Sequence, residues 1–147
     1  MEVRRSAELE ELAEEAHQAF LRHDNDWMAA HTADGEVVSF GTDPDEIWRG
    51  REEVLGLTTE QIEEMNTQAG LKYEREGVEG YEIGDAGFVI SHGRFVLADG
   101  TGFATRGINF MIKDGDTWKT IAGGMSLLVR NEQLSEGSPL AQAATTA

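Results

Sequence analysis

The sequence predicts an α+β domain in which a long, curved antiparallel sheet wraps around helices from the N-terminal part of the chain. Apolar residues recur at steps of three and four between Leu9 and Trp27, which is the spacing of one helix face. From Leu71 onward the apolar residues recur at every second position, which is typical of strands. A run of helical patterns followed by a run of strand patterns is the element order of the α+β class.

The N-terminal helical pattern is expected to divide into two helices. Its apolar stripe consists of Leu9, Leu12, Ala16, Ala19, Phe20, His23 and Trp27. The segment His23-Asp24-Asn25 interrupts the stripe, because Asp24 or Asn25 can cap a second helix that carries Trp27. Gly35 can adopt a positive φ and ends that helix, and a short strand follows over residues 36–40.

A turn and a third helix separate this strand from the long sheet. In the segment 43–46, Asp43 supplies a side-chain cap and Pro44 fixes φ, so the chain is expected to turn there. The third helix starts at Gly50 and ends at Gly70, and a break near residues 58–60 is one possibility. Its apolar side carries Val54, Leu57, Ile62 and Met65.

Four long strands are predicted at residues 71–83, 87–97, 103–113 and 118–129. The links between them are short and rich in Gly and Asp, so consecutive strands should pair antiparallel as hairpins. Glycines inside the strand patterns suit bulges and bends. Such a sheet can curve around the helices and leave an apolar cavity at its open end.

The composition favours an ordinary globular protein and disfavours two classes of partner. Of its 147 residues, 27% are charged and 39% are hydrophobic, and the formal net charge is −16 at pH 7. This negative field repels phosphate backbones and anionic lipids, so neither nucleic acid nor a membrane is an expected partner. The acidic residues most simply form a solvated surface.

The residue composition and the distribution of apolar residues also predict the location and the domain organisation. The sequence has no cysteine, which rules out disulfides and thiol chemistry, and no apolar run has the length of a membrane span. The N-terminus has no apolar signal-peptide core, so the expected location is the cytoplasm. Residues 1–130 are expected to form a single domain, and the small-residue tail 131–147 is expected to add no core.

Two segments resemble a known group of proteins. The stretch FGTDPDEIWRGREEV after the first strand and GDTWKTIAGGMSLLV as the last strand resemble the SnoaL-like group of the nuclear-transport-factor-2-like superfamily. The resemblance covers roughly residues 13–129, and its most specific piece is the run 41–52. It implies a cone-shaped, cystatin-like α+β barrel with a pocket between the helices and the concave sheet. Trp48 would then fold back at the rim of the cone as an apolar lid residue.

The superfamily resemblance implies steroid isomerisation, polyketide cyclisation, epoxide hydrolysis, dehydration or simple binding. The sequence departs from the isomerase pattern, from the epoxide-hydrolase pattern and from the histidines of related proteins. Ser39 lies where the carboxylate base of an isomerase would be expected, and Asp43 could reach back but more simply caps its turn. Asp99 lies in a hairpin turn, which is a poor position for an oxyanion donor. The strands hold no Arg-x-Asp pair of the epoxide-hydrolase kind. The last strand reads Ala-Gly-Gly-Met-Ser at 122–126, where related proteins often carry histidines.

The remaining catalytic candidate is His92, because the unperturbed pKa of imidazole lies near neutrality. Its alternative role is structural, as a hydrogen-bonded or subunit-facing side chain. Asp43 is the second catalytic candidate. The expected ligand-binding residues are Phe20, Trp27, Trp48, Asn109 and Met125. His17, His23 and His31 are spaced too widely for a helical metal site, so we expect neither a metal nor a cofactor.

Two functions remain open from the sequence. The first is a pocket for a small apolar or polycyclic molecule, with a cofactor-free isomerase, cyclase or dehydratase as its enzymatic form. The second is a non-catalytic ligand-binding or dimerisation module. The strands carry apolar residues on both faces, so the outer face of the sheet should need a cover, and we expect a homodimer.

Overall fold

The computed structural model of the protein describes residues 1–67 and 71–130. Its elements are β1 (Arg4–Arg5), α1 (Ala7–Leu21), α2 (Asn25–Ala30), β2 (Val38–Phe40), β3 (Ile47–Arg49), α3 (Arg51–Thr67), β4 (Lys72–Ile83), β5 (Ala86–Val96), β6 (Gly102–Asp114) and β7 (Thr117–Leu127). The predicted ends of the four long strands agree with these bounds to within two residues. The predicted helix end at Gly70 and the tail 131–147 lie outside the described residues.

Local capping explains where the first two helices begin. The Ser6 side chain accepts a hydrogen bond from the Leu9 amide at the start of α1, and the Asp24 side chain accepts one from the Trp27 amide at the start of α2. Between the two helices, His23 adopts a φ of 60°. The predicted interruption of the helical stripe is therefore confirmed.

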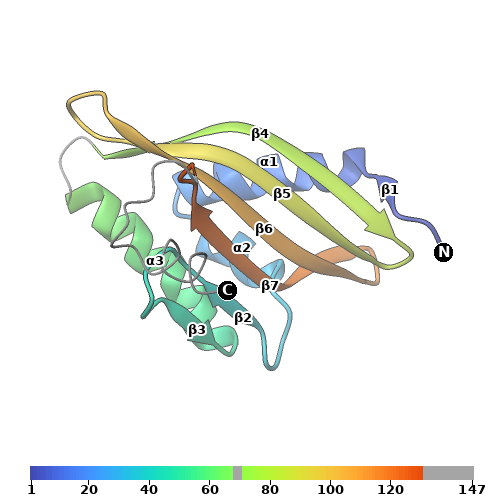
Figure 1. The fold of residues 1–147 in the computed structure, drawn as a ribbon. Helices are drawn as coiled ribbons and strands as arrows, with labels where there is room; N and C mark the ends of the chain where they lie inside the picture. The colour runs from blue at the N-terminus through green and yellow to red at the C-terminus, as the bar shows by residue number, and fades with distance from the viewer. Residues whose placement is uncertain (68–70, 131–147) are drawn as a thin grey trace, which may run out of the picture.

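The strands form one sheet in the order β1-β4-β5-β6-β7-β2-β3. The long strands β4 to β7 pair antiparallel through three hairpins and run side by side across the molecule (Figure 1). Each hairpin turns at a glycine with positive φ, namely Gly84, Gly100 and Gly115. β2 pairs parallel with β7, and an isolated parallel bridge joins Thr32 to Thr120.

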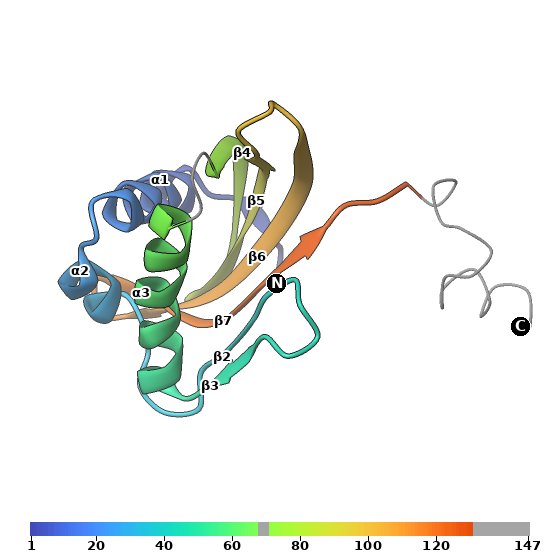
Figure 2. The ribbon, with the colours of Figure 1, turned by 90° about the vertical axis from the view of Figure 1, so that its left-hand side faces the viewer.

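The sheet is strongly curved, and the helices lie on its concave side. Figure 2 shows α1, α2 and α3 together on one side, with the long strands bending around them. Irregular pairing between Arg75 and Gly77 on β4, and between Phe110 and Met111 on β6, contributes to this bend. These features confirm the predicted α+β fold with a curved sheet wrapped around N-terminal helices.

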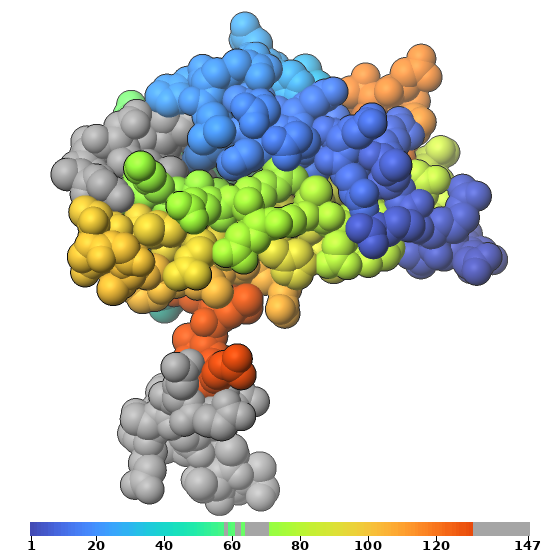
Figure 3. All heavy atoms as spheres, turned by 90° about the horizontal axis from the view of Figure 1, so that it is seen from above, coloured from blue at the N-terminus to red at the C-terminus, as the bar shows by residue number. Residues whose placement is uncertain are grey.

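The core lies where α1 packs on the sheet. Leu9 has no exposed surface and forms a buried cluster with Val89, Met111 and Trp118. The close approach of α1 depends on two glycines, since a Cβ on Gly80 would lie 2.6 Å from the Ser6 carbonyl oxygen and one on Gly87 would lie 2.5 Å from Leu9 Cδ1. The space-filling view shows the N-terminal segment lying along β4 (Figure 3).

Two short strands and the third helix differ from the sequence-based expectation. The short strands β1 and β3 were not predicted, and Trp48 lies in β3, where it pairs with Ser39 of β2. The possible break near residues 58–60 does not occur, because α3 continues from Arg51 to Thr67.

Within residues 1–67 and 71–130, no helix combines the length and apolarity needed to cross a bilayer.

Candidate ligand cavity

A cavity of about 920 Å³ lies between the helices and the concave face of the sheet. All three helices contribute to its wall, as do strands β2 to β7 and the turn after β2. The volume falls in the range of about 300–1,000 Å³ that is usual for small-molecule sites. The fold therefore provides the pocket expected from the curvature of the sheet.

The apolar part of the wall contains the residues predicted for it. Phe20 comes from α1, Trp27 from α2, Trp48 from β3 and Met125 from β7, and all four line the cavity. Met111, which also belongs to the buried core, adds a second thioether. Aromatic rings with flexible Met side chains give a wall that suits a flat or irregular apolar molecule.

The paired glycines on β7 admit side chains from neighbouring strands. Asn109 lines the cavity as predicted, and a Cβ on Gly123 would overlap its side-chain oxygen. On the other side of the strand, a Cβ on Gly124 would overlap the Phe40 ring. The segment that carries histidines in related proteins thus makes room here for an amide and a phenyl ring.

The rim of the cavity is polar and includes Asp43. The Asp43 carboxylate accepts a hydrogen bond from the Asp45 amide at 3.0 Å, while the Asp43 amide donates to Glu46 Oε1 at 2.8 Å. Asp43 is exposed, and Ser39 lines the cavity nearby. The carboxylate of Asp43 therefore caps the turn, as the sequence suggested, and also borders the cavity.

His92 lies on the opposite face of the sheet and is not among the residues that line the cavity. Its neighbours Val89, Ser91 and Phe95 point inward, so the alternation of β5 turns His92 outward. There its Nε2 lies 2.7 Å from Glu79 Oε2. The hydrogen bond from His92 is the main cause that lowers the pKa of Glu79. His92, the first catalytic candidate from the sequence, therefore does not border the cavity that Asn109 lines, and the prediction that the two flank one cavity is wrong.

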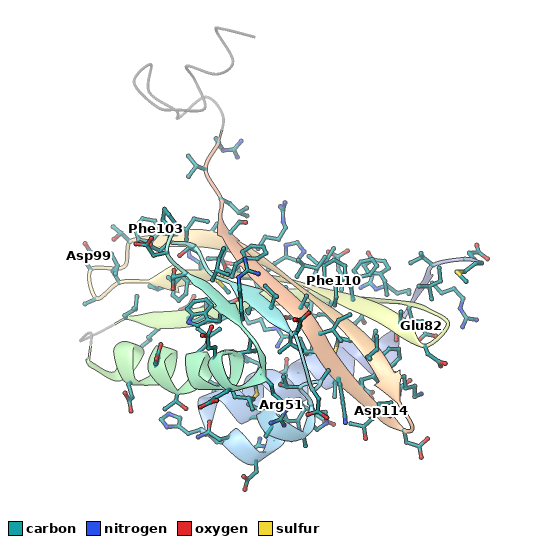
Figure 4. The ribbon with its side chains drawn as sticks, turned by 90° about the horizontal axis from the view of Figure 1, so that it is seen from below. Arg51, Glu82, Asp99, Phe103, Phe110 and Asp114 are labelled. Atoms are coloured by element: carbon teal, nitrogen blue, oxygen red, sulfur yellow. The ribbon has the colours of Figure 1, made fainter. Side chains whose placement is uncertain are left out.

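The outer face that carries His92 also carries exposed apolar side chains. Ile47 is 49% exposed and Phe110 is 43% exposed, and neither lines the cavity. Figure 4 shows Phe110 on the side of the sheet turned away from α3, to which Arg51 belongs. The second apolar face that motivated the homodimer prediction is therefore present.

His31 lines the cavity, although its position in the sequence suggested only a test for metal ligation. Its ring stacks on Trp27 with 3.8 Å between the centroids. Nδ1 of His31 lies 2.8 Å from the Trp27 carbonyl oxygen, which can only accept a hydrogen bond. Nδ1 therefore carries the proton, and in the neutral ring Nε2 keeps its lone pair.

A second missed group lies where α1 meets β4. His17, Tyr73 and Arg75 all line the cavity. Burial lowers the pKa of His17, the positive charge of Arg75 lowers it further, and the negative charge of Glu14 opposes the change. His17 lies four residues after Ala13 and three before Phe20, and this helical spacing could have indicated that it faces the cavity.

The residues 1–67 and 71–130 contain no cluster of three or more His, Asp or Glu side chains arranged to hold a metal ion. The polar groups that do line the cavity come singly from different elements, among them His17, His31, Arg75 and Asn109. They can donate or accept hydrogen bonds and protons. Their arrangement suits recognition of an organic molecule by hydrogen bonds.

Solved structures with similar folds belong to several kinds of protein. A protein with a cystatin-like fold from Caulobacter vibrioides is 15% identical with a TM-score of 0.66, covering 91% of this chain and 95% of its own. A candidate ketosteroid isomerase from Shewanella frigidimarina is 16% identical with a TM-score of 0.62, covering 79% and 92%. A candidate dehydratase of the NTF2-like (nuclear-transport-factor-2-like) family from Streptomyces avermitilis is 19% identical with a TM-score of 0.63, covering 81% and 93%.

These identities are low, so the structural similarities establish the fold alone. No curated protein matches the sequence. The sequence profile of the SnoaL-like domain matches residues 9–130, which is most of the chain and close to the extent of the resemblance seen in the sequence. The protein therefore belongs to the SnoaL-like domain family, within the NTF2-like fold.

Proposed function

We propose that the protein binds a small, largely apolar organic molecule in the cavity between the helices and the sheet. The observation that carries this proposal is the cavity of about 920 Å³, with aromatic and Met side chains on its wall and single polar groups between them. Burial of an apolar molecule there is favourable at about 25 cal/mol per Å² of surface removed from water. Phe20, Trp27, Trp48, Asn109 and Met125 are the proposed contact residues.

Fluorescence of the neutral dye N-phenyl-1-naphthylamine tests this proposal, because the dye brightens in apolar surroundings. Ala16 lines the cavity from α1, so Ala16→Trp should fill part of it and weaken dye binding at least tenfold. Glu15→Trp is the matched control, since the neighbouring Glu15 is exposed and does not line this cavity. Failure of the wild type to bind the dye, or equal weakening by both substitutions, would contradict the proposal.

A cofactor-free proton-transfer enzyme is the second candidate, and the orientation of His31 favours it. With Nδ1 held by the Trp27 carbonyl, Nε2 can take a proton from carbon next to a carbonyl and return it at the far end of the resulting dienolate. Asn109 could donate its amide hydrogen to the enolate oxygen. Such an isomerisation moves one proton and needs no co-reactant.

A β,γ-unsaturated ketosteroid is a suitable first substrate, since one neighbour in fold is described as a candidate ketosteroid isomerase. Formation of the conjugated enone can be followed by absorbance. We expect His31→Gln to reduce turnover by about 10²-fold or more while dye binding persists, and His92→Ala to leave turnover unchanged. Absence of turnover by the wild type would favour the non-catalytic binding module.

A further inference from the structure

The cavity has a positively charged end at Arg75 on β4. The Arg75 side chain is only 10% exposed, and its Nη1 donates a hydrogen bond to the Ala13 carbonyl oxygen of α1 at 2.8 Å. Among the side chains that the structure describes, the nearest carboxylate oxygen is Glu14 Oε2, which lies 3.8 Å from Nη1 and is too far away for a hydrogen bond. The Glu14 side chain is itself 58% exposed.

The charge of Arg75 is therefore incompletely compensated. Its Nη2 is buried and has no hydrogen-bond partner among residues 1–67 and 71–130. A buried guanidinium normally has a carboxylate in close contact, because removing the charge from water is costly without one. A carbonyl oxygen and a distant, exposed carboxylate supply less negative charge than this position requires.

A second buried polar atom lies in the same cross-strand row. Arg75 pairs with Gly93 of β5, and Gly93 pairs with Thr105 of β6. Thr105 is 1% exposed, and its Oγ1 also lacks a hydrogen-bond partner within the described part of the chain. Gly93 lies between Arg75 and Thr105 and has no side chain. A Cβ at Gly93 would overlap the Tyr73 hydroxyl.

The Tyr73 hydroxyl thus lies over Gly93, the residue that separates Arg75 from Thr105 in this row. The His17 ring meets Tyr73 edge-on, with 6.2 Å between the centroids, and completes this end of the wall. We call Arg75, Tyr73 and His17 the polar end of the cavity; Thr105 belongs to the same cross-strand row but is not one of the residues that line the cavity. Its groups offer several hydrogen-bond donors and one full positive charge.

We infer that the ligand is an apolar molecule bearing a single carboxylate, and that this carboxylate is bound at the polar end by Arg75. The inference rests on the proposed binding function and specifies its ligand class. One negative charge can pair with the Arg75 guanidinium and so offset repulsion by the net charge of −16, whereas the second charge of a dianion would be repelled without a second guanidinium at this end of the cavity. Nη2 is covered in this conformation, so pairing requires a rotamer change of the kind that is common at binding sites.

Two probes of the same shape separate this inference from general apolar binding. They are 1-naphthaleneacetate and the neutral 1-naphthaleneacetamide, each titrated against bound N-phenyl-1-naphthylamine. We expect the acid to displace the dye at a concentration at least tenfold lower than the amide. In Arg75→Gln this preference should disappear while the dye still binds.

Arg94→Gln is the matched control, because Arg94 lies on β5 and alternation turns it to the outer face. It removes the same charge from the same sheet and should leave the preference for the acid intact. Arg75→Lys keeps the charge without the planar fork and should retain a smaller preference, which provides a test if Arg75→Gln does not fold.

The outcomes separate failure of the proposed binding function from failure of the inference that the ligand carries a carboxylate. If the wild type does not bind the dye, the proposed function fails. If the dye binds but the acid and the amide compete equally in the wild type, the inference is overturned and the proposed function stands. An unchanged preference in Arg75→Gln, or equal losses in Arg75→Gln and Arg94→Gln, would also overturn it.

Discussion

Replacement of Leu9 by Ala should destabilise the fold more than any other single truncation on α1. Leu9 has no exposed surface and packs on Val89, Met111 and Trp118. Leu→Ala substitutions in buried sites cost about 2.7–5.0 kcal/mol, depending on how far the surroundings collapse into the space. At Leu9 the sheet presents the backbone of Gly80, whose added Cβ would lie 3.0 Å from Leu9 Cβ.

A glycine has no side chain that could move into the space left by Leu9, and the paired strands hold the backbone in place. We therefore expect a loss of about 4 kcal/mol in the free energy of unfolding, in the upper part of the range. For a chain of this length the melting temperature should fall by about 8–16 °C. Urea unfolding followed by circular dichroism measures the change.

Leu12→Ala is the matched control, one turn further along α1. Leu12 is half-buried and already borders the cavity, so its truncation enlarges existing space and should cost about 1–2 kcal/mol. A loss below about 2 kcal/mol for Leu9→Ala, or one no larger than that of Leu12→Ala, would refute the reasoning.

Three further predictions concern the helix cap, the cavity histidine and the outer face. Ser6→Ala should lower the free energy of unfolding by about 1–2 kcal/mol, because it removes the cap on the Leu9 amide and the hydrogen bond to Glu82, and urea unfolding would measure this. The pKa of His17 is lowered from 6.5 in the folded state, so its contribution to stability is present above that value and lost as the pH falls through the folded pKa. Compared with His17→Gln, the wild type should thus lose more stability between about pH 8 and about pH 5, and parallel curves would contradict this. Phe110→Asp should convert the predicted homodimer into a monomer by light scattering, and a monomeric wild type at micromolar concentration would count against the interface.

The four long strands of the sheet could be predicted from the sequence because strand alternation and turn chemistry are local. The hairpin glycines Gly84, Gly100 and Gly115 adopt the positive φ values that few other residues tolerate, so the strand ends could be placed from the sequence. The caps Ser6 and Asp24 act within three residues, and the break between α1 and α2 could be predicted for the same reason. β3 escaped prediction because its three residues are too few for a pattern.

The face of each strand that borders the cavity could not be predicted from the sequence, because it depends on how the whole sheet folds over the helices. On β5 both faces are apolar, so alternation alone did not reveal that Val89 points inward and His92 outward. On β4 the irregular pairing between Arg75 and Gly77 reverses the alternation. Arg75 and Glu79 are an even number of residues apart, yet Arg75 borders the cavity and Glu79 pairs with His92 on the outside. Gly77 marks a place where a bulge can form, but the hydrophobic pattern does not show which residue is the extra one, because that depends on how the sheet bends over the helices.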